Sequence, residues 1–321
     1  MIKSKKNKYL STYLIYLVSM LFALSMGSGF YGYGNDYYEA YYMPNLAWGG
    51  IFDQLGYRVA TLTIGEAHLG VYLVTFILAL SSGFLIREHI KFKQSYSLIF
   101  FISLYLIAIH TWPIIMSTSN AMRQGLAMSL VFMALIASSR KNYYWMMLLS
   151  FLAIFMHKTG LIFLMIVVFS TMMRYLTSNL SHLKKAVINF FIGASLLYGA
   201  LISLNLFGYI LSDESSRIIG GDFRWAFAFI SLIYITLSIF YKNILNNSFN
   251  LSLYYFSFIS LSFLISGLNW QYERMGMMMI IPYILSFGVI LNRPSYKIYL
   301  FLTFLGLLWV TILMGMYASL K

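Results

Sequence analysis

The chain has 321 residues, of which 60% are hydrophobic and only 10% are charged, and its mean hydropathy is +0.77. Soluble domains carry about 25% charged residues, so the composition excludes a soluble enzyme, a nucleic-acid-binding module and a disordered tail. Cysteine is absent, which excludes disulfides and thiolate metal sites. The net charge of +13 then indicates a membrane protein with basic cytoplasmic loops rather than a partner of nucleic acids.

Long apolar runs predict an all-α, polytopic membrane protein with about eleven transmembrane helices. A bilayer core of about 30 Å takes roughly 20 apolar helical residues to cross. In chain order, the runs are 9–26, 69–86, 96–112, 123–139, 143–156, 161–173, 186–206, 225–241, 250–268, 275–291 and 298–318. The first run is longer than the hydrophobic part of a signal peptide, about 7–15 residues, so we expect an uncleaved helix. Because the linkers are short, we expect one integral membrane domain over residues 1–321.

The distribution of basic residues predicts a cytoplasmic N-terminus. With that orientation, 15 of the 22 Lys and Arg residues fall on the inner side and seven on the outer side. Eight of the nine acidic residues fall on the outer side. Residues 143–177 would be too long for one crossing, so we interpret them as a hairpin that turns at His157 and Lys158. Its short arms predict that these two side chains lie below the outer membrane surface, in a recessed cationic site.

Three outer loops, 27–68, 207–224 and 269–274, contain most of the residues suited to chemistry. The first loop contains Asp36 in a glycine-rich turn, where the carboxylate either caps backbone N–H groups or takes part in a reaction. Its tyrosines either form an interfacial aromatic belt or stack against sugar rings. The candidate sugar-binding residues are Tyr37, Tyr38, Tyr41 and Trp270.

The outer arginines indicate recognition of an anion. Arg123 follows a Ser-Thr-Ser-Asn segment at the start of a helix, where a cation opposes the helix dipole. It is either an interface anchor or part of an anion site that also uses the helix N–H groups. Arginine is well suited to bidentate phosphate binding. The candidate diphosphate-binding residues are Arg123, Arg217, Arg224, Arg274 and Lys158, which lies beside His157.

Several common catalytic motifs are missing from the sequence. There is no Asp-x-Asp pair for a metal–diphosphate complex, no Walker loop for ATP and no Gly-x-Ser-x-Gly nucleophile elbow. The five histidines are scattered. We therefore expect no metal site and no cofactor.

Four short motifs resemble those of one family. They are Gly34-Asn35-Asp36-Tyr37 in the first outer loop, Arg123-Gln124-Gly125-Leu126-Ala127, Phe155-Met156-His157-Lys158-Thr159 and Glu273-Arg274. In this order and topology, the chain resembles the EpsG-like branch of the Wzy polysaccharide polymerases. The resemblance implies a GT-C-like glycosyltransferase in the bacterial plasma (inner) membrane. It would polymerise repeat units linked to undecaprenyl diphosphate into O-antigen (lipopolysaccharide) or capsule, beside a chain-length regulator and a flippase.

Glycosyl transfer requires stabilisation of the departing lipid diphosphate and a base for the acceptor hydroxyl. The arginines fit the first task, and the base remains open among Asp36, His157 and Glu273. Two alternatives are a lipid-linked oligosaccharide flippase and a membrane O-acetyltransferase. The crowding of polar groups on one side favours an enzyme over the flippase, which would line both halves of its path.

Overall fold

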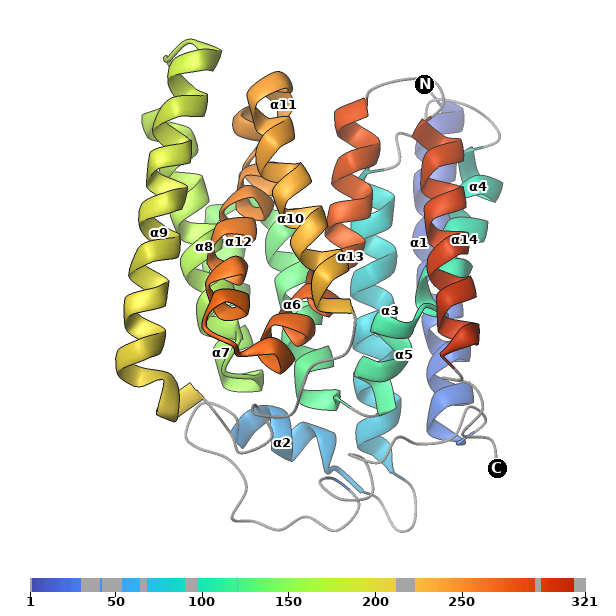
Figure 1. Ribbon diagram of the computed structural model, residues 1–321. Coiled ribbons are helices and arrows are strands. Elements are labelled where there is room, and N and C mark those ends of the chain that lie inside the picture. Colours follow the sequence, from blue (N-terminus) through green and yellow to red (C-terminus); the bar gives the residue numbers. More distant parts are fainter. Residues whose placement is uncertain are drawn as a thin grey trace. The chain divides into compact units, whose positions relative to one another are not determined.

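The computed structural model describes residues 2–29, 41, 54–63, 68–89, 97–119, 121–211, 223–291 and 296–314 (Figure 1). Within these ranges every regular element is a helix. The helices are α1 Ile2–Gly27, α2 Gln54–Ala60, α3 Leu69–His89, α4 Ser97–Ile109, α5 Trp112–Ser119, α6 Met122–Ser139, α7 Tyr143–Met156, α8 Gly160–Leu176, α9 His182–Leu211, α10 Phe223–Phe240, α11 Lys242–Asn246, α12 Ser248–Ile265, α13 Asn269–Leu291 and α14 Tyr296–Leu313. The prediction of an all-α polytopic protein is confirmed.

Each of the eleven apolar segments expected from the sequence falls on a helix. Among the described residues, six helices are long and apolar enough to cross a membrane, namely α1, α3, α6, α9, α10 and α12. The bent pair α4 and α5 would form a seventh span, and α7, α8 and α14 are shorter apolar helices. The chain is therefore a multi-pass membrane protein.

The segment expected at 96–112 is a broken helix. Helix α4 ends at Ile109, and α5 continues after a bend of 56°. Pro113 lacks the N–H that would continue the α4 hydrogen-bond ladder, so a new helix begins beside it. The backbone N–H of Trp112, released by the break, donates to the hydroxyl of Thr311 on α14 at 2.7 Å. The break therefore leaves this amide satisfied inside the protein.

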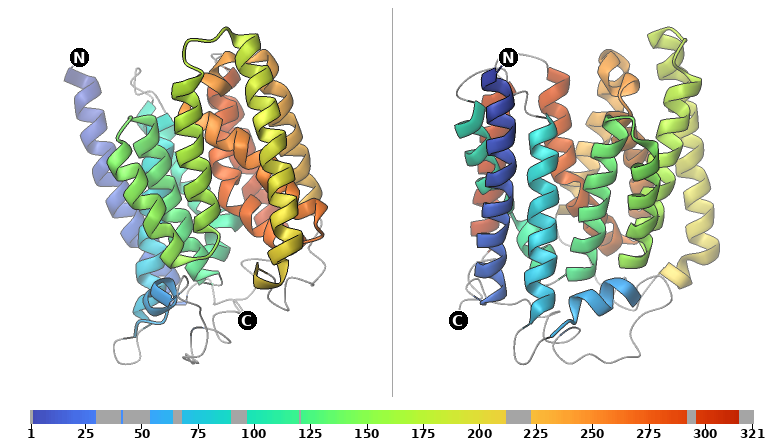
Figure 2. Two further views of the ribbon diagram at one scale, coloured as in Figure 1. Left: turned by 90° about the vertical axis from the view of Figure 1, so that its left-hand side faces the viewer. Right: turned by 180° about the vertical axis from the view of Figure 1, so that it is seen from behind.

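The contacts divide the chain into two compact units. Unit 1 comprises Met1–Ala137, Asn142–Leu164 and Phe287–Lys321, and unit 2 comprises Ser138–Lys141 and Met165–Ser286. In unit 1, α1, α3 and α4 run side by side (Figures 1 and 2). The Tyr105 hydroxyl on α4 bonds to Ser19 on α1 at 2.8 Å and to the Ala79 carbonyl on α3 at 3.0 Å. Such polar bonds join helices where lipid provides no hydrophobic drive for association.

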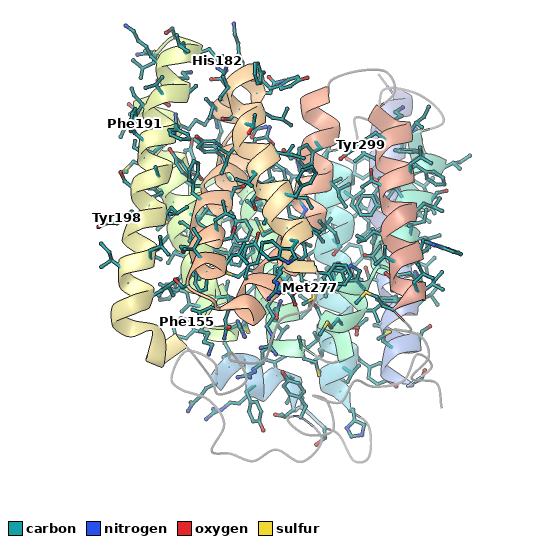
Figure 3. All side chains as sticks on the ribbon, viewed as in Figure 1. Phe155, His182, Phe191, Tyr198, Met277 and Tyr299 are labelled. Carbon is teal, nitrogen blue, oxygen red and sulfur yellow. The ribbon has the colours of Figure 1, made fainter. Side chains whose placement is uncertain are left out.

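Helix α12 is the core of unit 2, and all of its residues from Ser248 to Phe263 are buried. It packs against α9, α10 and α11. Its polar side chains bond to neighbouring helices, for example Asn250 with Ser286 at 2.8 Å and Ser257 with Tyr283 at 2.6 Å. In contrast, only 17% of the apolar part of α9 is buried, and Phe191 and Tyr198 point away from the other helices (Figure 3). This outer face of α9 is suited to lipid.

Candidate functional site

The described part of the chain contains seven of the twelve candidate residues with their side chains: Tyr41, Arg123, His157, Lys158, Arg224, Glu273 and Arg274. Asp36, Tyr37, Tyr38 and Arg217 lie outside the described residues, as does the side chain of Trp270 at the start of α13. Arg123 belongs to unit 1 and Arg274 to unit 2. Each unit therefore presents its own cluster.

The cluster in unit 1 is built on the short helix α2. This helix contacts α3 and α7 and is oriented across the direction of α3 (Figures 1 and 2). At Gly56, the backbone of α2 approaches the end of α7 so closely that an added Cβ would collide with the carbonyl oxygen of Met156. Only glycine permits this approach. The packing therefore fixes the next residue, Tyr57, beside the segment that contains His157.

Arg123 approaches Tyr57 from the start of α6. Its guanidinium carbon lies 6.0 Å from the centre of the Tyr57 ring, within the range of a cation–π contact. The Tyr41 ring lies 6.1 Å from the Tyr57 ring. Both tyrosines are buried, whereas Arg123 is half-buried. The structure thus unites one predicted diphosphate ligand and one predicted sugar ligand around a tyrosine that sequence reasoning did not select.

A close helix contact positions Arg123. A Cβ at Gly125 would collide with the carbonyl oxygen of Ser117, so α6 lies directly against the end of α5. The reversal between the two helices is held by a bond of 2.8 Å from the Ala121 N–H to the Met116 carbonyl. Gly125, two residues after Arg123 in the same motif, is therefore explained by packing.

Burial raises the pKa of the Tyr57 phenol above its ordinary value. The nearby Arg123 charge acts in the opposite direction, and Tyr41 adds to the rise. Because the net effect is upward, the phenol keeps its proton at neutral pH. Tyr57 is therefore a neutral hydrogen-bond donor beside a permanent cation.

His157 lies in the break between α7 and α8, as the hairpin interpretation expected. It is only 6% exposed. Its Nδ1 accepts a bond of 3.3 Å from the Thr159 N–H and lies 2.8 Å from the Thr159 hydroxyl oxygen. An Nδ1 that accepts leaves the proton of the neutral ring on Nε2. In this tautomer His157 presents a donor at Nε2. Lys158 is half-buried beside it.

The cluster in unit 2 joins the starts of α10 and α13. The backbone N–H of Arg224 donates to Oε1 of Glu273 at 3.1 Å. A carboxylate at a helix N-terminus satisfies an N–H group that has no partner within the helix and complements the dipole. The Arg224 guanidinium lies 5.3 Å from the centre of the Trp225 ring. Glu273 therefore brings the backbone of Arg224 close to the start of α13, where Arg274 is the next residue.

This contact gives Glu273 a structural task besides the catalytic one considered from the sequence. A substitution that removes the carboxylate removes a helix cap as well as a candidate base. Glutamine would keep an accepting oxygen for the Arg224 N–H while lacking the basicity of a carboxylate.

A family model for the EpsG family matches residues 8–319. The chain belongs to the EpsG family. No curated protein and no solved structure matches it. EpsG-like proteins are Wzy-type polysaccharide polymerases, so the family assigns a membrane polysaccharide polymerase, a glycosyltransferase in general terms.

The resemblance that the four sequence motifs indicated is thus confirmed at the level of the EpsG family. Two residues of these clusters, Tyr57 and Trp225, were not selected from the sequence. Tyr57 is 16 residues beyond Tyr41 in the same long loop, and no motif marks it. The sequence feature that could have drawn attention to Tyr57 is Gly56-Tyr57-Arg58, in which a glycine, an aromatic residue and a cation follow one another.

The described residues contain no group of three or more His, Asp or Glu side chains close enough to hold a metal ion. Seven acidic residues of the outer loops lie outside the described part: Asp36, Glu39, Asp53, Glu66, Asp213, Glu214 and Asp222. Metal independence of the EpsG-family chain therefore stays a prediction, for which a measurement is given below.

Proposed function

We propose that this EpsG-family chain polymerises oligosaccharide repeat units linked to undecaprenyl diphosphate into O-antigen or capsular polysaccharide. The reaction would take place on the outer face of the bacterial plasma membrane, within a GT-C-like fold. The observation that carries the proposal is the cluster of Arg123, Tyr57 and Tyr41 in unit 1. It places a guanidinium beside aromatic rings, which suits a ligand with an anionic diphosphate next to a sugar.

In the proposed reaction, a hydroxyl of the acceptor repeat attacks the anomeric carbon of the donor glycan. A new glycosidic C–O bond forms, and the bond between that carbon and the diphosphate breaks. The diphosphate leaves with the bonding electrons, and basic side chains stabilise its charge. The candidates for this role are Arg123 and Lys158 in unit 1 and Arg217, Arg224 and Arg274 in unit 2. The hydroxyl proton passes to a base. Tyr37, Tyr38, Tyr41 and Trp270 hold the sugar rings.

Three residues remain candidates for the base, and their contacts suggest how to separate them. Glu273→Gln keeps an oxygen for the Arg224 N–H, so a loss of rate in this variant points to the base rather than the cap. His157 serves as a base through Nε2 only if its ring adopts the other tautomer and gives up the Thr159 N–H. Asp36→Asn provides the third comparison.

The direct test is to incubate the purified protein with synthetic undecaprenyl-diphosphate-linked repeats and to separate the products on a glycan gel. We expect a ladder of products that grow by one repeat unit. A flippase would move the glycan across a vesicle membrane without lengthening it, and an O-acetyltransferase would add acetyl groups. Either of those products in place of a ladder would overturn the proposal.

Single-cysteine labelling tests the proposed orientation, and the lack of native cysteine makes it clean. We expect cysteines at positions Asn35, Ser215 and Asn269 to react with an impermeant reagent added outside the cell. Cysteines at Lys93, Asn179 and Asn246 should react only after the membrane is opened. Outside labelling at Asn179 would contradict the hairpin at His157 and reverse the orientation of all that follows.

Chelation of divalent metal is expected to leave the polymerisation rate nearly unchanged. Arginines provide permanent positive charge at the diphosphate, a role that a metal ion held by clustered carboxylates performs in other transferases. The measurement is the ladder rate in excess EDTA against an untreated sample. Loss of the ladder, restored by magnesium or manganese, would instead recast Asp36 and Glu273 as metal ligands.

A further inference from the structure

The hydroxyl of Tyr57 is buried in unit 1 without a hydrogen-bond partner among the described residues. The side chain is 6% exposed, so water has little access to it. A hydroxyl buried without a partner lowers the stability of the folded protein, because it has given up its hydrogen bonds to water. Phenylalanine, which occurs 27 times in this chain, would fill the same volume without that cost. The hydroxyl is thus a feature that the packing of α2 does not require.

The position of the phenol is fixed by backbone contacts. Gly56, the preceding residue, lies directly against the Met156 carbonyl at the end of α7. Helix α2 also packs against α3. The centre of the Tyr57 ring lies 6.0 Å from the Arg123 guanidinium carbon and 6.1 Å from the centre of the Tyr41 ring. A side chain held by several contacts presents its hydroxyl at a defined place, as a binding group must.

The groups beside Tyr57 indicate which chemical group a ligand would present to its hydroxyl. A guanidinium has five donors and no acceptor, so Arg123 cannot accept a bond from the phenol. A ligand atom that serves both groups must be an acceptor, and an anionic oxygen gains most from a cation and a neutral O–H together. The pKa of Tyr57, raised by burial, keeps the phenol in its donor form.

We propose that Tyr57 is a binding residue whose hydroxyl donates to an oxygen of the diphosphate that Arg123 holds. This rests on the proposed function for the identity of the diphosphate. Tyr57 would bind the lipid diphosphate in the ground state and as it departs. Tyr57 on α2 and Arg123 on α6 would then bind the same diphosphate.

The test compares Tyr57→Phe with the unchanged protein in binding of inorganic pyrophosphate. We expect pyrophosphate to raise the melting temperature of the unchanged protein, with sulfate at equal ionic strength as the reference. In Tyr57→Phe the apparent affinity should fall about tenfold, the usual effect of losing one bond to a charged group. Without ligand, its melting temperature should be unchanged or higher, because the variant removes a buried hydroxyl to which no described residue offers a partner.

Tyr105→Phe is the matched control, because the Tyr105 hydroxyl bonds to Ser19 and to the Ala79 carbonyl within unit 1. That variant should lower the melting temperature and leave pyrophosphate affinity unchanged. If Tyr57→Phe behaves like Tyr105→Phe, its hydroxyl bonds within the protein and the inference is wrong. Equal pyrophosphate affinity with an unchanged melting temperature would also overturn it.

The affinity measurement requires no turnover, so it separates this inference from the proposed function. A protein that makes no glycan ladder but binds pyrophosphate through Tyr57 contradicts polymerisation and supports the binding role. A protein that makes a ladder with equal rates and affinities in both forms contradicts the binding role alone. When the ladder is present, the KM for lipid-linked repeats should also rise about tenfold in Tyr57→Phe.

Discussion

Arg123→Lys is expected to slow the polymerisation of lipid-linked repeats by about ten- to a hundredfold, which corresponds to about 1.4–2.7 kcal/mol of transition-state stabilisation. Lysine keeps the charge but lacks the planar fork that binds a phosphate group at two oxygens. It also loses the contact of the guanidinium with the Tyr57 ring, whose centre lies 6.0 Å from the arginine carbon. Arg274→Lys should have a similar effect through loss of the fork. The measurement is the initial rate of ladder growth at saturating substrate.

The control for this comparison is Arg58→Ala, which removes an exposed arginine from α2 next to Tyr57. We expect it to retain the rate of the unchanged protein, so a general loss of positive charge would not explain the effect of the lysine variants. All variants must be compared at equal abundance in the membrane. Full activity in both Arg123→Lys and Arg274→Lys would remove bidentate recognition of the diphosphate from the mechanism.

The sequence predicts the helices well because the bilayer imposes a simple rule on them. A run of apolar residues must form a helix to satisfy its own backbone in lipid, so each expected segment coincides with an observed helix. This rule did not predict the break between α4 and α5. Pro113 marks it in the sequence, but the bond that satisfies the Trp112 N–H at the break comes from Thr311, 199 positions away in the chain.

The places of two candidate residues relative to the helices were predictable, because each place depends on neighbours in the chain. Arg123 at a helix start and His157 in a short polar break are visible in the sequence, and the structure finds them at those places. The proposed role of Tyr57 was not predictable from the sequence. It depends on the contact of Gly56 with α7 and on the absence of a partner for the Tyr57 hydroxyl among the described residues. Both are properties of the folded chain.

The structural contact of Glu273 was not predictable from the sequence either. In the sequence Glu273 is a carboxylate next to an arginine, which suggests either a local ion pair or a base. The structure adds a bond to the backbone of Arg224, 49 positions earlier. A helix cap from a residue so far along the chain leaves no pattern in the sequence, either as a periodic spacing or between neighbouring residues. It becomes visible only in the packing of α10 against α13 in unit 2.

Gly56→Ala is expected to abolish most of the polymerisation activity while the protein still folds. The added Cβ would collide with the carbonyl oxygen of Met156, and overpacking of this kind costs about 1–3 kcal/mol. Because α2 has seven residues and contacts only part of unit 1, it should move away from α7 rather than unfold the bundle. Tyr57 would then leave Arg123, and we expect the rate to fall at least about tenfold.

Gly306→Ala provides the matched control for this effect. Gly306 lies within α14, and an added Cβ there meets no atom within 4 Å. Alanine inside a helix is favoured over glycine by about 0.5–1 kcal/mol, so this variant should keep its rate and have an equal or slightly higher melting temperature. The measurement is the ladder rate together with the melting temperature and the affinity for pyrophosphate. If Gly56→Ala retained both the rate and the affinity, the close contact between α2 and α7 would have no part in holding Tyr57 beside Arg123.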